Sequence, residues 1–264
     1  MSLIGLALRI VTVKALVGKS FAEARVFDSA IAPLDTKVEE DAAPLLVVYT
    51  DEEDATLTAS DMFISDRDLS LVIHAAVANR VTTTAGGVTV EIPHTDEGLE
   101  ATLDLMRHDI MVALQTGADD WCDLWRRLVV KRKSLSIRRG ASAKKGLRFA
   151  ARELTLHVDT VADPAPGAGN TALMTDLVAA LRTDPDLSDL ADLIAARVSV
   201  GADWPDWRRV SAALGLNRRA HHAVGLGPQV VGEDPAPAGR LEIDQGGGRS
   251  GFVSPEGDEV VFSS

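Results

Sequence analysis

Two β-rich runs separated by a short basic segment constrain the fold of this chain most strongly. The runs VKRKSLSI and LRFAARELTLHV are joined by RRGASAKKG, and this order predicts an antiparallel pair of strands. The stretch from Arg126 to Arg152 contains eleven lysines and arginines and no acid, whereas the whole chain has a formal net charge of -12. Same-face residues on a strand lie only ~7 Å apart, within the ~8 Å screening length of physiological salt, so these cations need counter-charge.

Three sources of that counter-charge are open: the chain's own acids, an acidic surface on a neighbouring subunit, and the phosphates of a nucleic acid. The acidic total argues against a general nucleic-acid-binding protein. The basic pair also lacks the interleaved aromatic residues of a platform for single strands, since Phe149 is its only aromatic. Phosphate is therefore the least favoured of the three.

Helices and strands are both expected before the basic pair. Leu3–Val17 predicts a buried helix that ends at Gly18, and Thr95 begins a helix with regularly spaced apolar residues that ends at Gly117. DDWCDLWRRLV predicts a shorter helix. LLVVYT and LSLVIHAAVA predict buried strands separated by an acidic loop, DEEDATLTASD, and VTTTAGGVTVEIP predicts a hairpin-like return.

The second half of the chain is more polar and more interrupted. The segment 162–170, rich in proline, glycine and alanine, predicts a linker and the best domain boundary. Helices are expected over 171–182, 186–198 and 206–214. A second linker precedes a tail with three short apolar patches, which is too small for a core of its own and is expected to lie on its own domain or on a neighbour.

No catalytic or metal-binding pattern is evident. Cys122 is the only cysteine, which excludes an intrachain disulfide and a cysteine-based zinc site and is typical of a reducing cytoplasm. The six histidines show no ligand spacing, and His74, in an apolar strand, is expected to be a hydrogen-bonded core or edge residue. The glycine-rich segments lack the frame of a phosphate loop. The sequence therefore predicts no enzyme, metal or cofactor, and the short apolar start predicts neither a signal peptide nor a membrane span.

A run of segments resembles the tail-terminator (tail completion) proteins of long-tailed bacteriophages and the related gene transfer agents. The segments, in chain order, are SLIGLALRIVTVKAL, RVFDSAIAP, PLLVVYTDE, LSLVIHAAVA, VEIPHTDEGLEATLDLMRHDIMVAL, WCDLWRRLV and IRRGASAKKGLRFAARELTLHVD. The resemblance implies an α+β fold, with a small, mainly antiparallel sheet flanked by helices. It covers about residues 2–161. We therefore expect a tail-terminator-like domain over 1–161, the linker 162–170, a small helical module over 171–228 and a β-rich C-terminal arm over 229–264.

The resemblance also implies a function. Such proteins are structural virion components, not enzymes, and six copies form a ring that caps the tail tube, stops its polymerisation and joins the tail to the head neck. The implied partners are copies of the chain, the major tail tube protein, a stopper or adaptor protein of the neck, and genome DNA that passes non-specifically through the lumen. The implied location is the tail–neck junction of a virion assembled in the host cytoplasm.

In a closed ring, one face of each subunit meets a different face of the next, which suits a basic surface on an acidic chain. Our hypothesis places the basic pair at the subunit or tube interface first and in the lumen second. Its candidate residues are Lys131, Arg132, Lys133, Arg138, Arg139, Lys144, Lys145 and Arg148. The alternatives are another head–tail joining protein (a stopper or an adaptor), or a cytoplasmic DNA-binding protein that uses the hairpin 126–152.

Overall fold

The computed structural model describes residues 2–29, 43–57, 63, 65–77, 81–85, 88–92, 95–144, 147–216, 218–225, 241–244, 250–253 and 260–263. The chain divides into two units, Met1–Gly227 and Pro228–Ser264, and each is described by itself. No helix in the described ranges is both long enough and apolar enough to span a bilayer.

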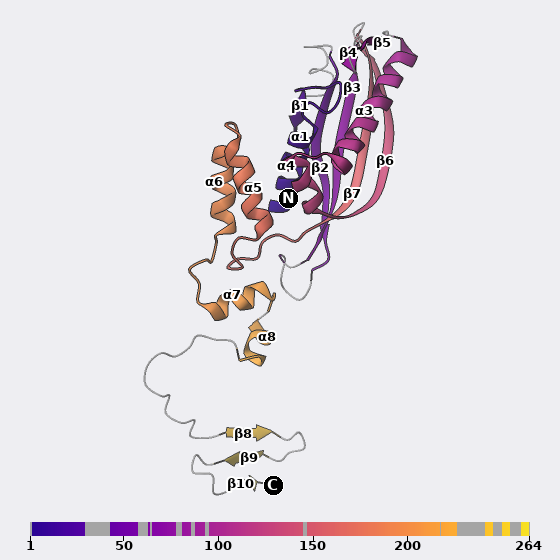
Figure 1. Ribbon diagram of the computed structural model, residues 1–264. Coiled ribbons are helices and arrows are strands. Elements are labelled where there is room, and N and C mark those ends of the chain that lie inside the picture. Colours follow the sequence, from indigo (N-terminus) through magenta and orange to yellow (C-terminus); the bar gives the residue numbers. More distant parts are fainter. Residues whose placement is uncertain are drawn as a thin grey trace. The chain divides into compact units, whose positions relative to one another are not determined.

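The first unit is built around a mixed five-stranded sheet (Figure 1). Its strands follow the order β1 (Val26–Asp28), β2 (Leu45–Ala55), β3 (Arg67–Val77), β7 (Leu147–Thr160) and β6 (Val129–Lys144). Only β1 pairs in parallel, with β2, and the other neighbours are antiparallel. The α+β class and the mainly antiparallel sheet are thus as expected, and β6 lies at an edge of this sheet.

Three helices pack with the sheet: α1 (Leu3–Leu16), α3 (Asp96–Thr116) and α4 (Asp120–Leu128). The buried face of α3 has apolar residues at the predicted helical spacing, namely Leu99, Leu103, Met106, Ile110 and Leu114. Two other apolar residues of this helix, Leu105 and Val112, are exposed. α1 instead is apolar on most sides, because it also contacts α4. In α4, buried Trp125 donates a hydrogen bond from Nε1 to Thr12 Oγ1 at 3.1 Å, which satisfies both polar groups in the core.

The predicted helices after the linker are present as α5 (Ala172–Thr183), α6 (Ser188–Val198) and α7 (Asp206–Ala213), and a short α8 (Arg218–Ala223) follows. Buried residues of α5 and α6 belong to the same core cluster as those of α1, α3 and α4. The structure places one boundary, after Gly227, and keeps 171–227 in one unit with 1–161.

Both long strand pairs extend further than expected. The predicted acidic loop after Thr50 begins as strand, since Glu53 and Ala55 pair with Leu69 and Arg67 of β3. The predicted loop 138–146 was also wrong over 138–144, because these residues pair with β7, while 145 and 146 lie outside the described residues. In both places cross-strand pairing outweighs the local preference of acidic or glycine-containing segments for turns.

The described residues also form two smaller sheets, one of two strands and one of three. β4 (Val81–Ala85) pairs antiparallel with β5 (Val88–Ile92), as the predicted return requires, while its turn at Gly86 and Gly87 lies outside the described residues. The second unit contains β8 (Leu241–Asp244), β9 (Ser250–Val253) and β10 (Val260–Ser263), paired antiparallel in the order β10-β9-β8.

Candidate interaction surface on strand β6

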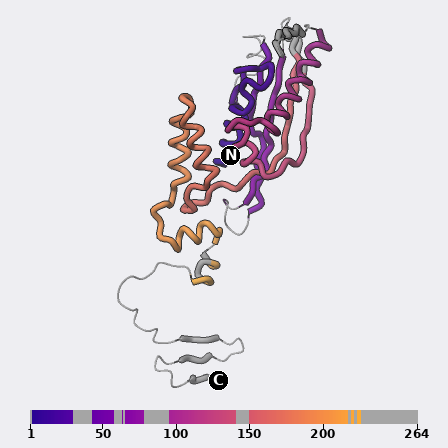
Figure 2. Tube along the Cα trace, in the orientation of Figure 1, coloured from indigo at the N-terminus to yellow at the C-terminus, as the bar shows by residue number. Residues whose placement is uncertain are grey.

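Strand β6 exposes an unusually long run of residues. Every residue from Val130 to Gly140 is exposed, and we call this run the β6 surface. Its apolar members Val130, Leu135 and Ile137 are 58%, 41% and 40% exposed. Figure 2 shows β6 as the outermost strand, next to β7, its only neighbour in the sheet. An exposed edge strand with apolar side chains is a feature that soluble proteins usually avoid unless another chain covers it.

The register assigns the side chains of β6 to two faces. Leu135 and Ile137 pair with Leu156 and Leu154 of β7, which belong to the core beneath the helices. Arg139 follows them on this helix-covered face. Ser134, Ser136 and Arg138 therefore point to the opposite face.

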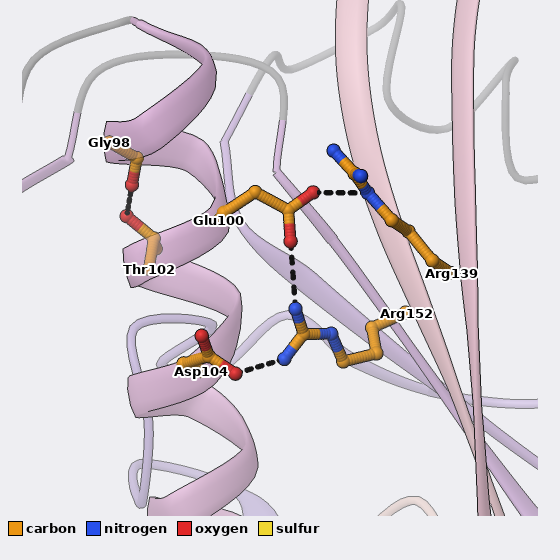
Figure 3. A network of polar contacts seen from close by, with 6 residues as sticks. All are labelled: Gly98, Glu100, Thr102, Asp104, Arg139 and Arg152. Carbon is orange, nitrogen blue, oxygen red and sulfur yellow. Dashed lines mark hydrogen bonds and ion pairs between the residues drawn. The ribbon is translucent and has the colours of Figure 1, made fainter.

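On the helix-covered face, two cations of the basic pair bind acids of α3 (Figure 3). Arg139 Nε donates to Glu100 Oε1 at 2.7 Å, and Arg152 donates from one nitrogen to Glu100 Oε2 at 2.8 Å and from the other to Asp104. Glu100 thus connects β6 and β7 through one carboxylate. These contacts attach α3 to the edge of the sheet.

At the start of β6, Lys133 lies between two acids. Its Nζ is 2.8 Å from an oxygen of Asp68 and 2.7 Å from one of Asp159. The hydrogen bonds to Asp159 and then to Asp68 raise the pKa of Lys133 above its ordinary value. Nearby, the guanidinium of Arg132 lies 5.2 Å from the ring centroid of Trp125, in a cation–π contact.

The chain's own acids are therefore counter-ions for much of the basic stretch. Eight of its eleven cations have side chains that the structure describes, and six of these eight contact an acid of the same chain. These six are Arg126, Arg127, Lys133, Arg138, Arg139 and Arg152. Lys131 has no ion pair with a described residue, and Arg138 is 79% exposed with its nitrogen 3.8 Å from Glu153. The side chains of Lys144 and Arg148, and the whole of Lys145, lie outside what the structure describes.

A polar cluster on the opposite face of the sheet was not anticipated as a group. The ring nitrogen Nε2 of His74 has two partners: Tyr49 Oη at 3.0 Å and Glu153 Oε2 at 2.9 Å. The expectation that His74 is hydrogen-bonded is therefore confirmed. Ser70 and His157 make a second pair, with 3.0 Å between Oγ and Nδ1. The sequence shows these polar residues alternating with apolar ones along β3 and β7, which indicates a shared polar face. Which of them are neighbours depends on the register between the two strands, which the sequence does not give.

This polar cluster lies beside a pocket in the sheet. The pocket is shallow, with a volume of about 320 Å³, and Asp51, Glu52 and Arg138 are among its lining residues. Tyr49 and Glu153 contact the same ring nitrogen of His74, so they do not form a relay through both nitrogens. Burial and then the charges of Glu153 and Asp51 raise the pKa of Tyr49, which keeps the phenol protonated.

Cys122 is a free cysteine whose side chain is buried. Burial, with further contributions from Asp119, raises the pKa of the Cys122 thiol to about 11, so the thiol is protonated at neutral pH. No group of three or more histidine, cysteine or acidic residues with metal-site geometry occurs among the described residues. No protein-family model matches the sequence, and no curated protein is significantly similar to it.

Proposed function

We propose that this chain is a structural subunit of a tail-terminator-like ring, which ends a phage-type tail tube and joins it to the head neck. The β6 surface is the part that we assign to contact with another protein. It combines backbone groups at a sheet edge, apolar side chains and cations on one strand. The small sheet with helices packed on it fits the fold that the resemblance implies.

The single observation that carries this proposal is the exposure of Val130, Leu135 and Ile137 on an edge strand. Leaving three large apolar side chains in water costs hydrophobic free energy that burial in an interface recovers, at about 25 cal/mol per Å² of apolar area. A function based on assembly explains this exposure, because assembly supplies the missing cover.

The candidate cations have two different roles in this proposal. Lys133 and Arg139 bind acids of their own subunit and hold the sheet edge and α3 in place. Lys131 and Arg138 are the better candidates for contact with a partner, because one has no described ion pair and the other is mostly exposed. Their charge would speed encounter and fix orientation more than it would raise affinity.

The test combines ring formation with tube length. The wild-type chain is expected to form six-membered rings, alone or on tubes, when measured by native mass spectrometry and electron microscopy. When the chain is added to polymerising tube protein, tubes are expected to stop at a defined length. The double variant Lys131→Gln, Arg138→Gln should weaken ring formation or tail attachment, whereas Arg182→Gln, an exposed cation of α5, should not.

Two outcomes would contradict the proposal. A stable dimer with no effect on tube length would remove the basis for a terminator. Normal rings and normal tail attachment after neutralisation of Lys131 and Arg138, together with Leu135→Thr and Ile137→Thr, would show that the β6 surface is not the contact. If tubes stop at a defined length but do not attach to heads, the chain would terminate the tube and another protein would join the tail to the head.

DNA binding by the hairpin 126–152 is measured separately. Each phosphate that a cation neutralises adds about 0.9 to the salt slope, so eleven free cations would give a slope near ~10. With five cations held by acids of the chain and Arg138 counted as free, we expect a slope no steeper than about 5.4 for fluorescence anisotropy with duplex DNA. A slope near ten, from a monomer, would favour the DNA-binding alternative.

A further inference from the structure

The edge of β6 is not uniform along its length. Register shifts occur between Val129 and Lys131 and between Arg132 and Ser134, which disrupt regular pairing at the start of the strand. From Ser134 onward the register with β7 is regular as far as Lys144. Natural edge strands are commonly protected by bulges, lysines or prolines. The register shifts and two lysines, Lys131 and Lys133, protect the start of β6, and Lys144 ends the strand. Ser134–Gly140 contains neither a bulge nor a lysine, so it is the described part of β6 that is open to a further strand.

The exposed residues of this open segment define what could bind there. Leu135 and Ile137 are on one face, spaced by two residues, and Ser134, Ser136 and Arg138 are on the other. A strand added beside β6 would place every second side chain next to Leu135 and Ile137, and the intervening side chains next to Arg138. The matching strand therefore alternates apolar residues with acidic ones.

The described edge strands of a second copy do not meet this requirement in full. A second β6 has no acidic residue to place beside Arg138, and antiparallel pairing centred on Ser136 would set Arg139 of one copy opposite Lys133 of the other, where like charges destabilise. β1 is only three residues long. β8 in the second unit does alternate apolar and acidic residues, in the sequence Leu-Glu-Ile-Asp, but its four residues cover little more than half of the seven in Ser134–Gly140. The charge and the length together favour a different polypeptide.

We propose that Ser134–Gly140 of β6 binds an extended acidic segment of a different protein as an additional strand of the sheet. Backbone hydrogen bonds at the free edge give affinity, and the alternation of apolar and acidic side chains gives specificity. The inference rests on the proposed function only for the origin of the partner, which would be the tube or neck protein. In the ring, β6 would then contact that protein and not the adjacent copy.

Binding is tested on the purified full-length chain with synthetic peptides. The probe is a fluorescent eight-residue peptide that alternates leucine and glutamate. The controls are the same peptide with two N-methylated backbone nitrogens on one edge, and a peptide that alternates leucine and lysine. Saturable binding of the acidic probe is expected by anisotropy, with affinity reduced about tenfold by N-methylation, because two backbone hydrogen bonds are lost at unchanged charge.

Variants locate the site. The double variant Leu135→Thr, Ile137→Thr keeps strand propensity but removes the apolar pair. It should lower the affinity for the acidic probe at least about fivefold. Proline is placed in turn at Ser136 and Ile137, because one of two adjacent N–H groups faces β7 and the other faces the free edge. The proline on the free edge should abolish binding while the thermal midpoint changes little, and the other proline should lower that midpoint.

The results that overturn this inference are specific. Equal affinity for the N-methylated peptide would show charge attraction without strand addition. A disulfide-linked dimer of Ser136→Cys, in a chain whose native Cys122 is buried, would show that a second copy covers the edge. Peptide binding and ring formation are measured separately, so loss of rings with intact peptide binding would refute the proposed function alone.

Discussion

Replacing Arg152 by glutamine should destabilise the first unit more than the same change at Arg139, although both arginines bind Glu100. Arg152 is only 12% exposed and also contacts Asp104, whereas Arg139 is 69% exposed and has one acidic partner. Hydrogen bonds to charged groups contribute about 1.5–3 kcal/mol when shielded, and exposed ion pairs about 0–1 kcal/mol. We therefore expect losses of about 2 kcal/mol for Arg152→Gln and about 0.5 kcal/mol for Arg139→Gln in the free energy of unfolding.

The assay is urea denaturation followed by circular dichroism, with the slope m compared among variants to verify that the extent of unfolding is unchanged. Glu100→Gln completes two double-mutant cycles, and the coupling of Glu100 to Arg152 should exceed its coupling to Arg139. Raising the salt concentration should weaken the Arg139 coupling more, because that pair is more exposed. Equal losses for the two arginines, or a larger loss for Arg139, would refute the inference that Arg152 is the stronger of the two ion-pair attachments of α3 to the sheet.

Three further predictions concern groups away from β6. Cys122 should react with a thiol reagent only on unfolding, and the free energy of unfolding should fall between pH 9 and about 11, where the unfolded thiol ionises and the folded one does not. Cys122→Ala should reduce this fall and leave the part contributed by Tyr49 and Lys133, whose pKa values are also raised. Gly201→Ala should lower the free energy of unfolding by at least about 1 kcal/mol more than Gly169→Ala, as measured by urea denaturation. Both glycines have φ near +78°, but only at Gly201 would the new Cβ lie 2.7 Å from a tryptophan ring. The ion pair with Lys14 lowers the pKa of Asp184, so its contribution to stability is present above pH 3.8 and is lost at lower pH. In thermal melts measured at several pH values, Lys14→Gln should make the melting temperature fall less as the pH drops below 3.8.

Local signals in the sequence were sufficient for most helices. Thr95 accepts a hydrogen bond from the backbone N–H of Gly98, and the helix it begins ends before Gly117, as the capping residues predicted. Here the cap, the apolar spacing and the terminal glycine agree with one another. The start of β2 and the apolar part of β3 from Leu69 to Val77 were equally clear, because these apolar runs are buried on both faces. The first two residues of β3, Arg67 and Asp68, were not predicted.

The partners of the basic residues could not be predicted in the same way. Asp68 lies 65 positions from Lys133, and Glu100 lies 39 from Arg139. These pairs depend on strand order and register, which local periodicity does not determine. The same is true of His74 and Glu153, which are 79 positions apart and meet only because β3 and β7 are adjacent. Sequence reasoning identified the charge of the stretch correctly but left its counter-ions open.

Because many cations of the basic stretch form ion pairs within the chain, fewer are available to attract a partner at an interface. If all eleven cations were free, attraction to an acidic partner would dominate contact and would fall steeply with salt. Six instead contact acids of the chain: Arg139 and Arg152 bind α3, Lys133 binds β3, and Arg127 of α4 binds Asp176 of α5. What remains at the open part of β6 is a sheet edge, two apolar side chains and one loosely held arginine, Arg138. Affinity at such a surface comes mainly from backbone pairing and apolar burial, and the remaining charge selects the partner, so binding there should retain most of its strength at high salt.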